Sequence, residues 1–380
     1  MLLTSFRLLR PRYETSQEEI LTWLADVHCR AEATAVARSG RDFDAKAFLA
    51  HTRRLIRHVC CGSDRIAMRG YSASDREHAE TAETALYDVS QKPAGAGMSA
   101  RTDLYAREVE TAFERLYGAD SEPPDHLVHV TCTGYVSPSG AQRLVTNRGW
   151  GERTRVTHAY HMGCYASVPA LRIASGLAQT GNESGRVDVV HTELCSLHFD
   201  PSIHTPEQLV VQSLFADGHA RYTLRRDAKG EPALRILALH EVLVSGSEDA
   251  MQWRLGDNGM RMSLSRELPA QLTRGIRPFV QDLLGKAGLD LATERTRCMF
   301  AVHPGGPKVI DVVRDALEVE ERQVAASRRV LRRFGNMSSA TLPHIWSDLL
   351  AADEVTKGTH VVSIAFGPGL TFAGAVLRKE

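Results

Sequence analysis

The sequence has no excess of charge of either sign and no long apolar run. Lysine and arginine together number 46, as do aspartate and glutamate, so the chain lacks the basic field that nucleic-acid binding exploits. No stretch approaches the length of a membrane span. Residues 1–10 carry charges inside their apolar run and lack a small-residue cleavage site, which argues against a signal peptide. We therefore expect a soluble, cytoplasmic protein that contacts neither nucleic acid nor membrane.

Paired cysteines are also missing. The seven cysteines are odd in number and never spaced Cys-x-x-Cys, which argues against a disulfide framework and a structural zinc site. His126 and His129, like His158 and His161, are three apart, but both pairs lie in segments that read as extended. In a strand this spacing points the two side chains to opposite faces, and no carboxylate or cysteine completes a ligand set. We expect no metal site.

What the chain does contain is an alternation of strand and helix patterns. Leu2–Leu9 is predicted to be a strand, and residues 16–24 begin a helix in which Ser16 and Glu19 form a capping-box pattern. Residues 237–245 start a second, similar half, and residues 359–366 are predicted to be the last core strand. At 380 residues the chain can bury a large core. This alternation predicts an α/β protein.

Cys164 stands at the centre of the most informative stretch, residues 156–178. A short extended segment precedes it, and small and apolar residues follow on every face, as in a helix buried all round. A cysteine between a strand and the start of a helix lies near unpaired N–H groups and the positive end of the helix dipole, which favour the thiolate. A thiolate can accept an acyl group. Free cysteines in protein cores are, however, more often inert.

Two later segments bear on this choice. Residues 297–302 read as a buried strand that ends at His303, and the glycines that follow allow a ligand to approach the backbone; the alternative is a structural histidine. Residues 328–334 read as the end of a helix that breaks at Gly335, and Asn336 comes next. An asparagine at such a break is by default a helix cap.

Together, these segments resemble the type III polyketide synthases, the chalcone synthase-like branch of the thiolase superfamily. The resemblance rests on Gly163–Ala166, His303–Pro307 and Gly335–Ala340, with support from Ser213–Gly218 and Phe366–Leu370. Their order and separations match that family from about residue 50 to residue 375. Any one of these segments would be a weak signal, whereas five in the right order are a strong one.

The resemblance implies a five-layered αβαβα thiolase fold of two similar halves, which we place at residues 1–225 and 226–380. It also implies a homodimer that needs no cofactor and acts on phosphopantetheine thioesters, carried by coenzyme A or by an acyl carrier protein. Cys164 would hold the acyl chain. His303 and Asn336 would stabilise the enolate of the second thioester in a Claisen condensation, and an imidazolium at His303 would help to keep Cys164 ionised.

The resemblance further assigns a substrate cavity. Phe215 matches an aromatic gatekeeper, Met262 falls where the second gatekeeper is a phenylalanine, and Cys195 and His198 replace threonines of the plant enzymes. The remaining substrate-binding residues that we expect are Cys132, Thr133, Gly305, Gly306, Ser338, Gly367 and Pro368.

These departures predict a fatty or linear polyketide substrate instead of an aromatic one. Leu55, His58 and Gly62 stand where plant enzymes carry the cations that grip coenzyme A, while Arg53, Arg54, Arg57 and Lys308 are expected at the entrance, facing an acidic acyl carrier protein. Both features resemble the stand-alone ketosynthases that join two carrier-bound β-ketoacyl chains into an α-pyrone, as in the myxopyronin and corallopyronin antibiotic pathways.

Other functions fit the same three residues. An alkylpyrone or alkylresorcinol synthase would extend its chain with malonyl coenzyme A, and an enzyme like 3-oxoacyl carrier-protein synthase III shares cysteine, histidine and asparagine. A Cys-His-Asn hydrolase would use water in place of a carbanion. A non-catalytic scaffold would not need all three reactive positions to be filled.

Overall fold

The computed structural model describes residues 1–76, 86–180, 185–228 and 230–380. Within these residues, nine strands form one continuous sheet in the order β11-β12-β13-β8-β1-β7-β6-β4-β5. Their bounds are β1 (Leu2–Leu9), β4 (His126–Thr131), β5 (Arg155–Tyr160), β6 (Val187–Leu194), β7 (Asp217–Arg225), β8 (Leu234–Leu243), β11 (Met299–Val302), β12 (His360–Gly367) and β13 (Thr371–Lys379).

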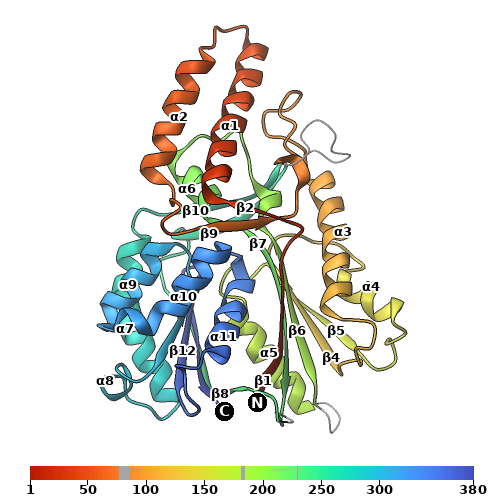
Figure 1. Ribbon diagram of the computed structural model, residues 1–380, viewed down its shortest axis with the longest axis vertical. Coiled ribbons are helices and arrows are strands. Elements are labelled where there is room, and N and C mark those ends of the chain that lie inside the picture. Colours follow the sequence, from red (N-terminus) through yellow and green to blue (C-terminus); the bar gives the residue numbers. More distant parts are fainter. Residues whose placement is uncertain (77–85, 181–184, 229) are drawn as a thin grey trace.

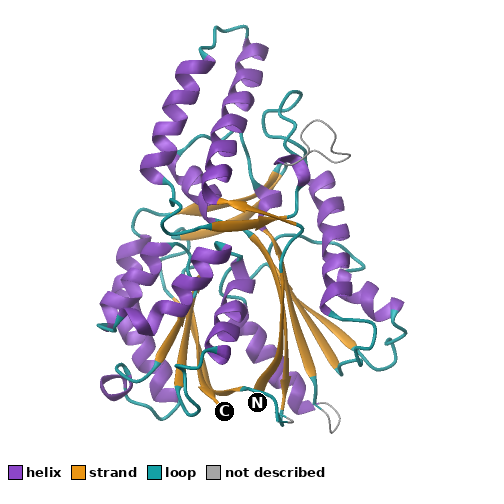
Figure 2. Ribbon diagram, in the orientation of Figure 1, coloured by secondary structure: helices purple, strands orange, loops and turns teal. Residues whose placement is uncertain are grey.

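This sheet consists of two half-sheets that diverge from a narrow junction. β1 and β8 pair through Leu2 with Arg235 and Leu3 with Leu234, and Figure 2 shows the strands spreading from there as two fans with helices between them. The central helices α5 (Ser167–Thr180) and α11 (Thr341–Ala351) each contact strands of both half-sheets. One fan carries α7 (Leu268–Lys286) and α9 (Pro307–Leu317) outside it, and the other carries α3 (Met98–Leu116) and α4 (Gly140–Asn147). The predicted five-layered αβαβα fold is confirmed.

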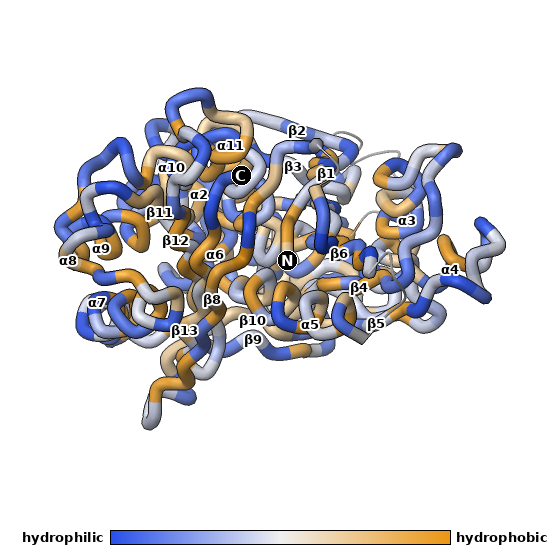
Figure 3. The backbone as a smooth tube through the Cα atoms, turned by 90° about the horizontal axis from the view of Figure 1, so that it is seen from below, coloured by the Kyte–Doolittle hydropathy of each residue, from blue (hydrophilic) through white to orange (hydrophobic). Residues whose placement is uncertain are grey.

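The pattern of hydropathy explains this layering. Trp346 and Ile345 on α11 are fully buried, because both faces of the central layer lie against strands. The outer helices alternate between hydrophilic and hydrophobic residues, as Figure 3 shows for α3 and α7, because only one face of each meets a sheet. Among the described residues, no helix is long and apolar enough to cross a membrane.

A smaller group of elements covers the end of the sheet where the functional residues lie (Figure 1). Helices α1 (Gln17–Ser39) and α2 (Ala45–Val59) form a projecting hairpin, and α1 begins with the predicted capping box of Ser16 and Glu19. The other elements of this group are β2 (Tyr13–Ser16), β3 (Met68–Tyr71), α6 (Pro206–Leu214), β9 (Met251–Gly256), β10 (Gly259–Leu264), and the 3-10 helices η1 (Ser74–Arg76), η2 (Cys195–His198) and η3 (Ser338–Ala340). Helix α10 (Glu321–Phe334) packs against β11 and α11, and α8 (Leu291–Glu294) lies at the opposite end of the sheet.

Two predictions about the elements are wrong. The strand at residues 359–366 is not the last, since β13 follows it and pairs with both β12 and β8 inside the sheet. The helix after Cys164 is not buried all round, because Arg172, Gly176 and Gln179 are exposed, although residues 166–171, Ala174 and Ala178 are buried. The exposed residues are spaced four and three apart and so lie on one side of α5, while its other sides contact strands of both half-sheets.

Candidate active site

Cys164 lies in a tight turn between β5 and α5, as the sequence predicts. The turn is closed by a hydrogen bond from the Ala166 N–H to the Gly163 carbonyl (3.1 Å), and Cys164 is 7% exposed. Gly163 has a φ of 81°, and a Cβ atom there would lie 2.8 Å from Cδ of Pro368. Glycine is therefore required beside the cysteine for both backbone conformation and space.

Asn336 is connected to Cys164 through one intervening residue. Its Oδ1 accepts a hydrogen bond from the Ser338 N–H (2.9 Å), and the Ser338 hydroxyl lies 3.6 Å from Sγ of Cys164 and 3.0 Å from Sγ of Cys132. The backbone of Asn336 forms a bridge with Phe215. Asn336 is thus not the helix cap that its position suggests by default, since η3 begins two residues later at Ser338. Its side-chain NH2 group is left to act as a donor.

His303 follows the last residue of β11 and is 1% exposed. Neither of its ring nitrogens has a hydrogen-bond partner within the described part of the chain, which is unusual for so deeply buried an imidazole. Its backbone N–H donates to the Ile364 carbonyl of the parallel strand β12 (2.8 Å). β12 ends at Gly367, which packs against Tyr165, and the next residue, Pro368, packs against Gly163. The ends of these two strands bring His303 to the same end of the sheet as Cys164.

Burial controls the protonation of both reactive side chains. It raises the pKa of the Cys164 thiol to about 12, and it lowers the pKa of His303 to about 3. Both shifts favour the neutral forms, whereas the sequence suggested a thiolate stabilised by an imidazolium and a helix end. The helix contributes little because α5 begins three residues beyond Cys164, and its field falls off within the first turn.

The residues predicted to bind substrate divide between two adjoining spaces. A chamber of about 10 Å³ surrounds Cys164, which is room for about one water molecule. A mostly apolar cavity of about 110 Å³ lies next to it, bounded by α1, η2, α6 and the β9–β10 hairpin, and His198 lines it. Four residues contribute to both walls: Cys195, Phe215, Trp253 and Met262. The predicted residues Cys132, Thr133, Ser338 and Pro368 line the chamber.

Three predicted substrate-binding glycines line neither space. A Cβ atom at Gly306 would lie 3.4 Å from the Leu214 side chain, one at Gly305 would lie 3.4 Å from Val309, and one at Gly367 would fall on the ring of Tyr165. At Gly367 the contact excludes any side chain, so this glycine permits strand β12 to pack against the segment that carries Cys164.

The predicted entrance cations are on the surface. Arg53, Arg54 and Arg57 are exposed on α2 of the projecting hairpin, and Lys308 is exposed in the first turn of α9. Arg53 forms an ion pair with Asp26 of α1 (3.0 Å). The hairpin also supplies the α1 part of the cavity wall.

Two residues that shape the chamber were not predicted from the sequence. One lines the chamber wall, and the other supports that wall. Trp253 stands opposite Met262 in the β9–β10 hairpin, lies 6.5 Å from Phe215 between ring centroids, and donates a hydrogen bond to the Cys132 carbonyl (2.7 Å). The strand that faces Met262 therefore places an aromatic side chain beside it, in the wall shared by the chamber and the cavity.

The second missed residue is Glu193, which is fully buried on β6. Its carboxylate accepts hydrogen bonds from the Cys132 N–H (3.1 Å) and the Thr133 hydroxyl (3.0 Å), and it is also bonded to the Ser339 hydroxyl. Burial raises the pKa of Glu193. Burying a carboxylate in a strand costs free energy unless the carboxylate is hydrogen-bonded. A glutamate within a strand of otherwise buried residues is therefore the sequence signal that could have identified Glu193.

Comparison with known proteins agrees with this geometry. Residues 100–227 match the N-terminal domain of the chalcone and stilbene synthases, and residues 236–379 match their C-terminal domain. The chain is 31% identical to type III polyketide synthase A of Arabidopsis thaliana, over 72% of this chain and 70% of that protein. It is 33% identical to probable polyketide synthase 1 of Dictyostelium discoideum, over 69% of this chain but only 8% of that much longer protein.

The fold is similarly shared. The structure of 1,3,6,8-tetrahydroxynaphthalene synthase from Streptomyces coelicolor superposes with a TM-score of 0.80 at 22% identity, covering 100% of this chain and 99% of that one. The chain therefore belongs to the chalcone and stilbene synthase family, the type III polyketide synthases, which are ketosynthases that transfer acyl groups from coenzyme A thioesters and need no cofactor.

Proposed function

We propose that Cys164 accepts the acyl chain and that His303 and Asn336 stabilise the enolate that attacks it. Because burial favours the neutral thiol and the neutral imidazole, the thiol proton passes to His303 as the sulfur attacks the thioester carbonyl, and His303 returns it to the carrier sulfur, which leaves as the thiol. The free ring nitrogens of His303 support this role, since a base must have a nitrogen that is not already bonded.

The second thioester then loses carbon dioxide or a proton, and its charge moves to the carbonyl oxygen. The NH2 group of Asn336 suits this oxyanion because it is a neutral donor, and its Oδ1 is held by the Ser338 N–H, which fixes the orientation of the amide. His303 supplies the second donor. The carbanion attacks the acyl group on Cys164, which forms a new carbon–carbon bond, breaks the carbon–sulfur bond and releases Cys164 as a thiolate that then takes up a proton from solvent.

The observation that carries the substrate assignment is the difference in size between the two spaces. The chamber has room for about one water molecule, so a chain attached to Cys164 must pass Phe215, Trp253 and Met262 into the apolar cavity. Trp23, Leu24 and Phe199 line that cavity, which favours a linear aliphatic chain.

One wall of the cavity favours a β-ketoacyl chain over a saturated one. Arg69 is buried in this wall, and its Nη2 has no hydrogen-bond partner among the residues that the structure describes. A keto oxygen on the chain would satisfy this donor, and an unsatisfied buried donor costs about 1–3 kcal/mol. Joining two such chains and closing the ring through an enol oxygen would give an α-pyrone, the kind of product made in the antibiotic pathways named above.

We further propose that the acyl donor is an acidic carrier protein. The exposed Arg54 and Arg57 lie on the hairpin that also lines the cavity, which supports an encounter between a negatively charged partner and this surface.

We also propose that the protein is a cytoplasmic homodimer and that the chain divides into two halves between residues 225 and 226. The division is supported by the two family profiles, which end at residue 227 and begin again at residue 236.

The test compares matched thioesters. The protein is mixed with one β-ketoacyl group and with the corresponding saturated acyl group, each on an acyl carrier protein and on coenzyme A, and intact-protein mass spectrometry follows the mass added to Cys164. We expect faster loading and condensation from the carrier protein and from the β-ketoacyl group. Equal or better turnover of the coenzyme A thioesters would remove the carrier proposal and favour an alkylpyrone or alkylresorcinol synthase that uses malonyl coenzyme A. Free acid without chain extension would indicate a hydrolase. Cys164→Ala is the control for non-enzymatic acylation.

A further inference from the structure

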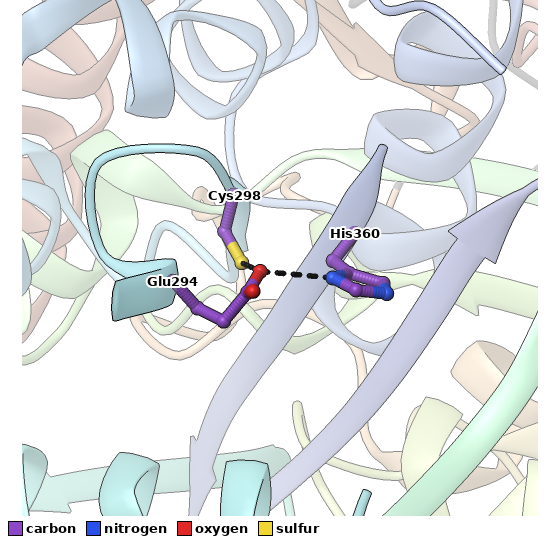
Figure 4. A group of neighbouring side chains, drawn as sticks. All are labelled: Glu294, Cys298 and His360. Atoms are coloured by element: carbon purple, nitrogen blue, oxygen red, sulfur yellow. Dashed lines mark hydrogen bonds and ion pairs between the residues drawn. The ribbon is translucent and has the colours of Figure 1, made fainter. Parts of the chain in front are cut away.

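A mixed group of potential metal ligands lies outside the active site, at the opposite end of strand β11. It consists of Glu294, Cys298 and His360 (Figure 4). Glu294 is the last residue of α8, and the Cys298 N–H donates to its carbonyl (2.9 Å), which closes a turn between them. β11 and β12 are parallel, and Met299 pairs with Val361. Cys298 and His360 are the residues immediately before this pair, so they lie side by side. Three segments of the chain thus place these side chains together.

The ligand atoms converge on a small volume. Oε2 of Glu294 is 2.9 Å from Nδ1 of His360 and 3.6 Å from Sγ of Cys298, and the three ligand atoms all lie within 4.8 Å of one another. In a tetrahedral zinc site, bonds of about 2.0–2.3 Å separate neighbouring nitrogen, oxygen and sulfur ligands by roughly 3.3–3.6 Å. Small rotations of the side chains would reach this geometry, and Figure 4 shows the thiol and the imidazole facing the carboxylate from two sides.

The kind and exposure of the ligands narrow the choice of ion. Calcium and magnesium prefer oxygen ligands only, whereas zinc takes imidazole, thiolate and carboxylate together. Cys298 is fully buried, while the side chains of Glu294 and His360 are 13% and 19% exposed, which leaves a path for the ion and a position for water. Glu294 and His360 by themselves would form an ordinary ion pair. The buried Cys298 thiol, which points at the same carboxylate oxygen, is the feature that favours a metal site.

We propose that Glu294, Cys298 and His360 bind one zinc ion, with water as the fourth ligand. Binding releases the thiol proton to solvent and fixes the turn before β11 to the first residue of β12. β11 spans Met299–Val302 and leads directly to His303, so the ion would stabilise the strand that positions the proposed base. This site is separate from the histidine pairs considered in the sequence and does not depend on the proposed substrate.

The experiment uses the full chain in a Cys164→Ala background, so that metal bound to the active-site thiol is not counted. The protein is stripped with a chelator and titrated with cobalt(II), whose thiolate bond gives a near-ultraviolet charge-transfer band, and then with zinc. We expect saturation near one equivalent per chain, loss of the band as zinc displaces cobalt, and a higher Tm with zinc. Absence of the thiolate band in stripped, folded protein overturns the proposal.

Variants assign the ligands. Glu294→Gln, Cys298→Ser and His360→Gln should each weaken cobalt and zinc binding, and Cys298→Ser should abolish the thiolate band. Cys29→Ser, which changes a buried cysteine on α1, should bind both metals like the parent protein. A band that survives Cys298→Ser, or zinc binding unaffected by both Glu294→Gln and His360→Gln, would also overturn the proposal. If Cys298→Ser does not fold, Glu294→Gln, which can still hydrogen-bond to His360, tests the proposal instead: unchanged cobalt and zinc binding by this variant would overturn it.

Discussion

The chamber around Cys164 and the apolar cavity beside α1 share four wall residues but differ in what lies behind those walls. Behind the chamber, hydrogen bonds run from Asn336 through Ser338 to Cys132 and on to the buried carboxylate of Glu193. The cavity is bounded mainly by rings and aliphatic chains such as Trp23, Leu24 and Phe199, and the polar side chains in its wall, such as Gln208, donate to backbone carbonyls. Hydrogen bonds between side chains therefore connect the residues around the chamber, whereas apolar packing makes up most of the cavity wall.

This difference indicates which property of the enzyme each region controls. A bonded network fixes donors to within a few tenths of an ångström, as the stabilisation of a developing charge requires. Apolar packing tolerates changes of volume at modest cost, so the size of the cavity can vary while the chemistry stays the same. Changes in the chamber should consequently alter rate, and changes in the cavity should alter the choice of chain.

The largest effect is expected in the chamber, at the nucleophile. Cys164→Ala should abolish acyl loading, because burial and the nearby Glu193 raise the pKa of the other two cysteines of the chamber wall, Cys132 and Cys195, well above the usual value. Intact-protein mass spectrometry after mixing with a thioester measures the loading. Cys195→Ala is the matched control, since Cys195 lines the same chamber and should still allow Cys164 to load. Retained acylation of the Cys164→Ala protein would show that a different residue is the nucleophile.

The next largest effect separates loading from condensation. Asn336→Ala should load an acyl group normally but lose about 10²–10³-fold in condensation rate, the usual cost of one oxyanion donor. Single-turnover mass spectrometry resolves the two steps. Asn336→Asp retains an oxygen that accepts from the Ser338 N–H but replaces the donor with a charge, so it should also load and fail to condense. Asn258→Ala, in the exposed turn of the β9–β10 hairpin, is the control. Normal condensation by Asn336→Ala would remove its assigned role.

The protonation of Cys164 gives an effect of intermediate size. Because burial raises its pKa to about 12, the thiolate fraction should grow by about tenfold for each pH unit between pH 6 and pH 9, and alkylation should accelerate in proportion. Iodoacetamide labelling followed by peptide mass spectrometry measures the rate at Cys164. A rate that is flat between pH 6 and pH 8 would instead demonstrate a preformed thiolate and imidazolium pair.

The two regions also differ in how much of their structure could be predicted from the sequence. The turn at Cys164 and the capping box of Ser16 could be predicted because each depends on neighbours within a few residues. The segment Phe366–Leu370 indicates the family but not the turn that it forms. The strand β13 that follows was therefore not predicted, although residues 371–379 pair along their length with β12 and β8.

Properties that arise from distant contacts were less accessible. Trp253 replaces the missing aromatic at Met262 only because the hairpin register sets the two residues opposite each other. The pKa shifts of Cys164 and His303, which favour their neutral forms, result from burial by residues distant in the sequence, and no local pattern predicts them. The reactive residues could be predicted, but their charge and the shape of the space around them required the folded chain.

The smallest effect should come from the wall between the two spaces. Met262→Trp should reduce the cavity and shift the preference toward shorter acyl chains, whereas Met262→Ala should shift it toward longer ones, by about 1–3 kcal/mol in relative kcat/KM for each methylene gained or lost. Competition between thioesters of different chain length, read by product mass spectrometry, measures the shift. Leu255→Ala changes a 58% exposed residue of the same hairpin and should leave the preference unchanged. Because Met262 also borders the chamber, an equal loss of rate for all chain lengths would mean that this wall supports the chemistry, and the proposed division between the two spaces would not hold.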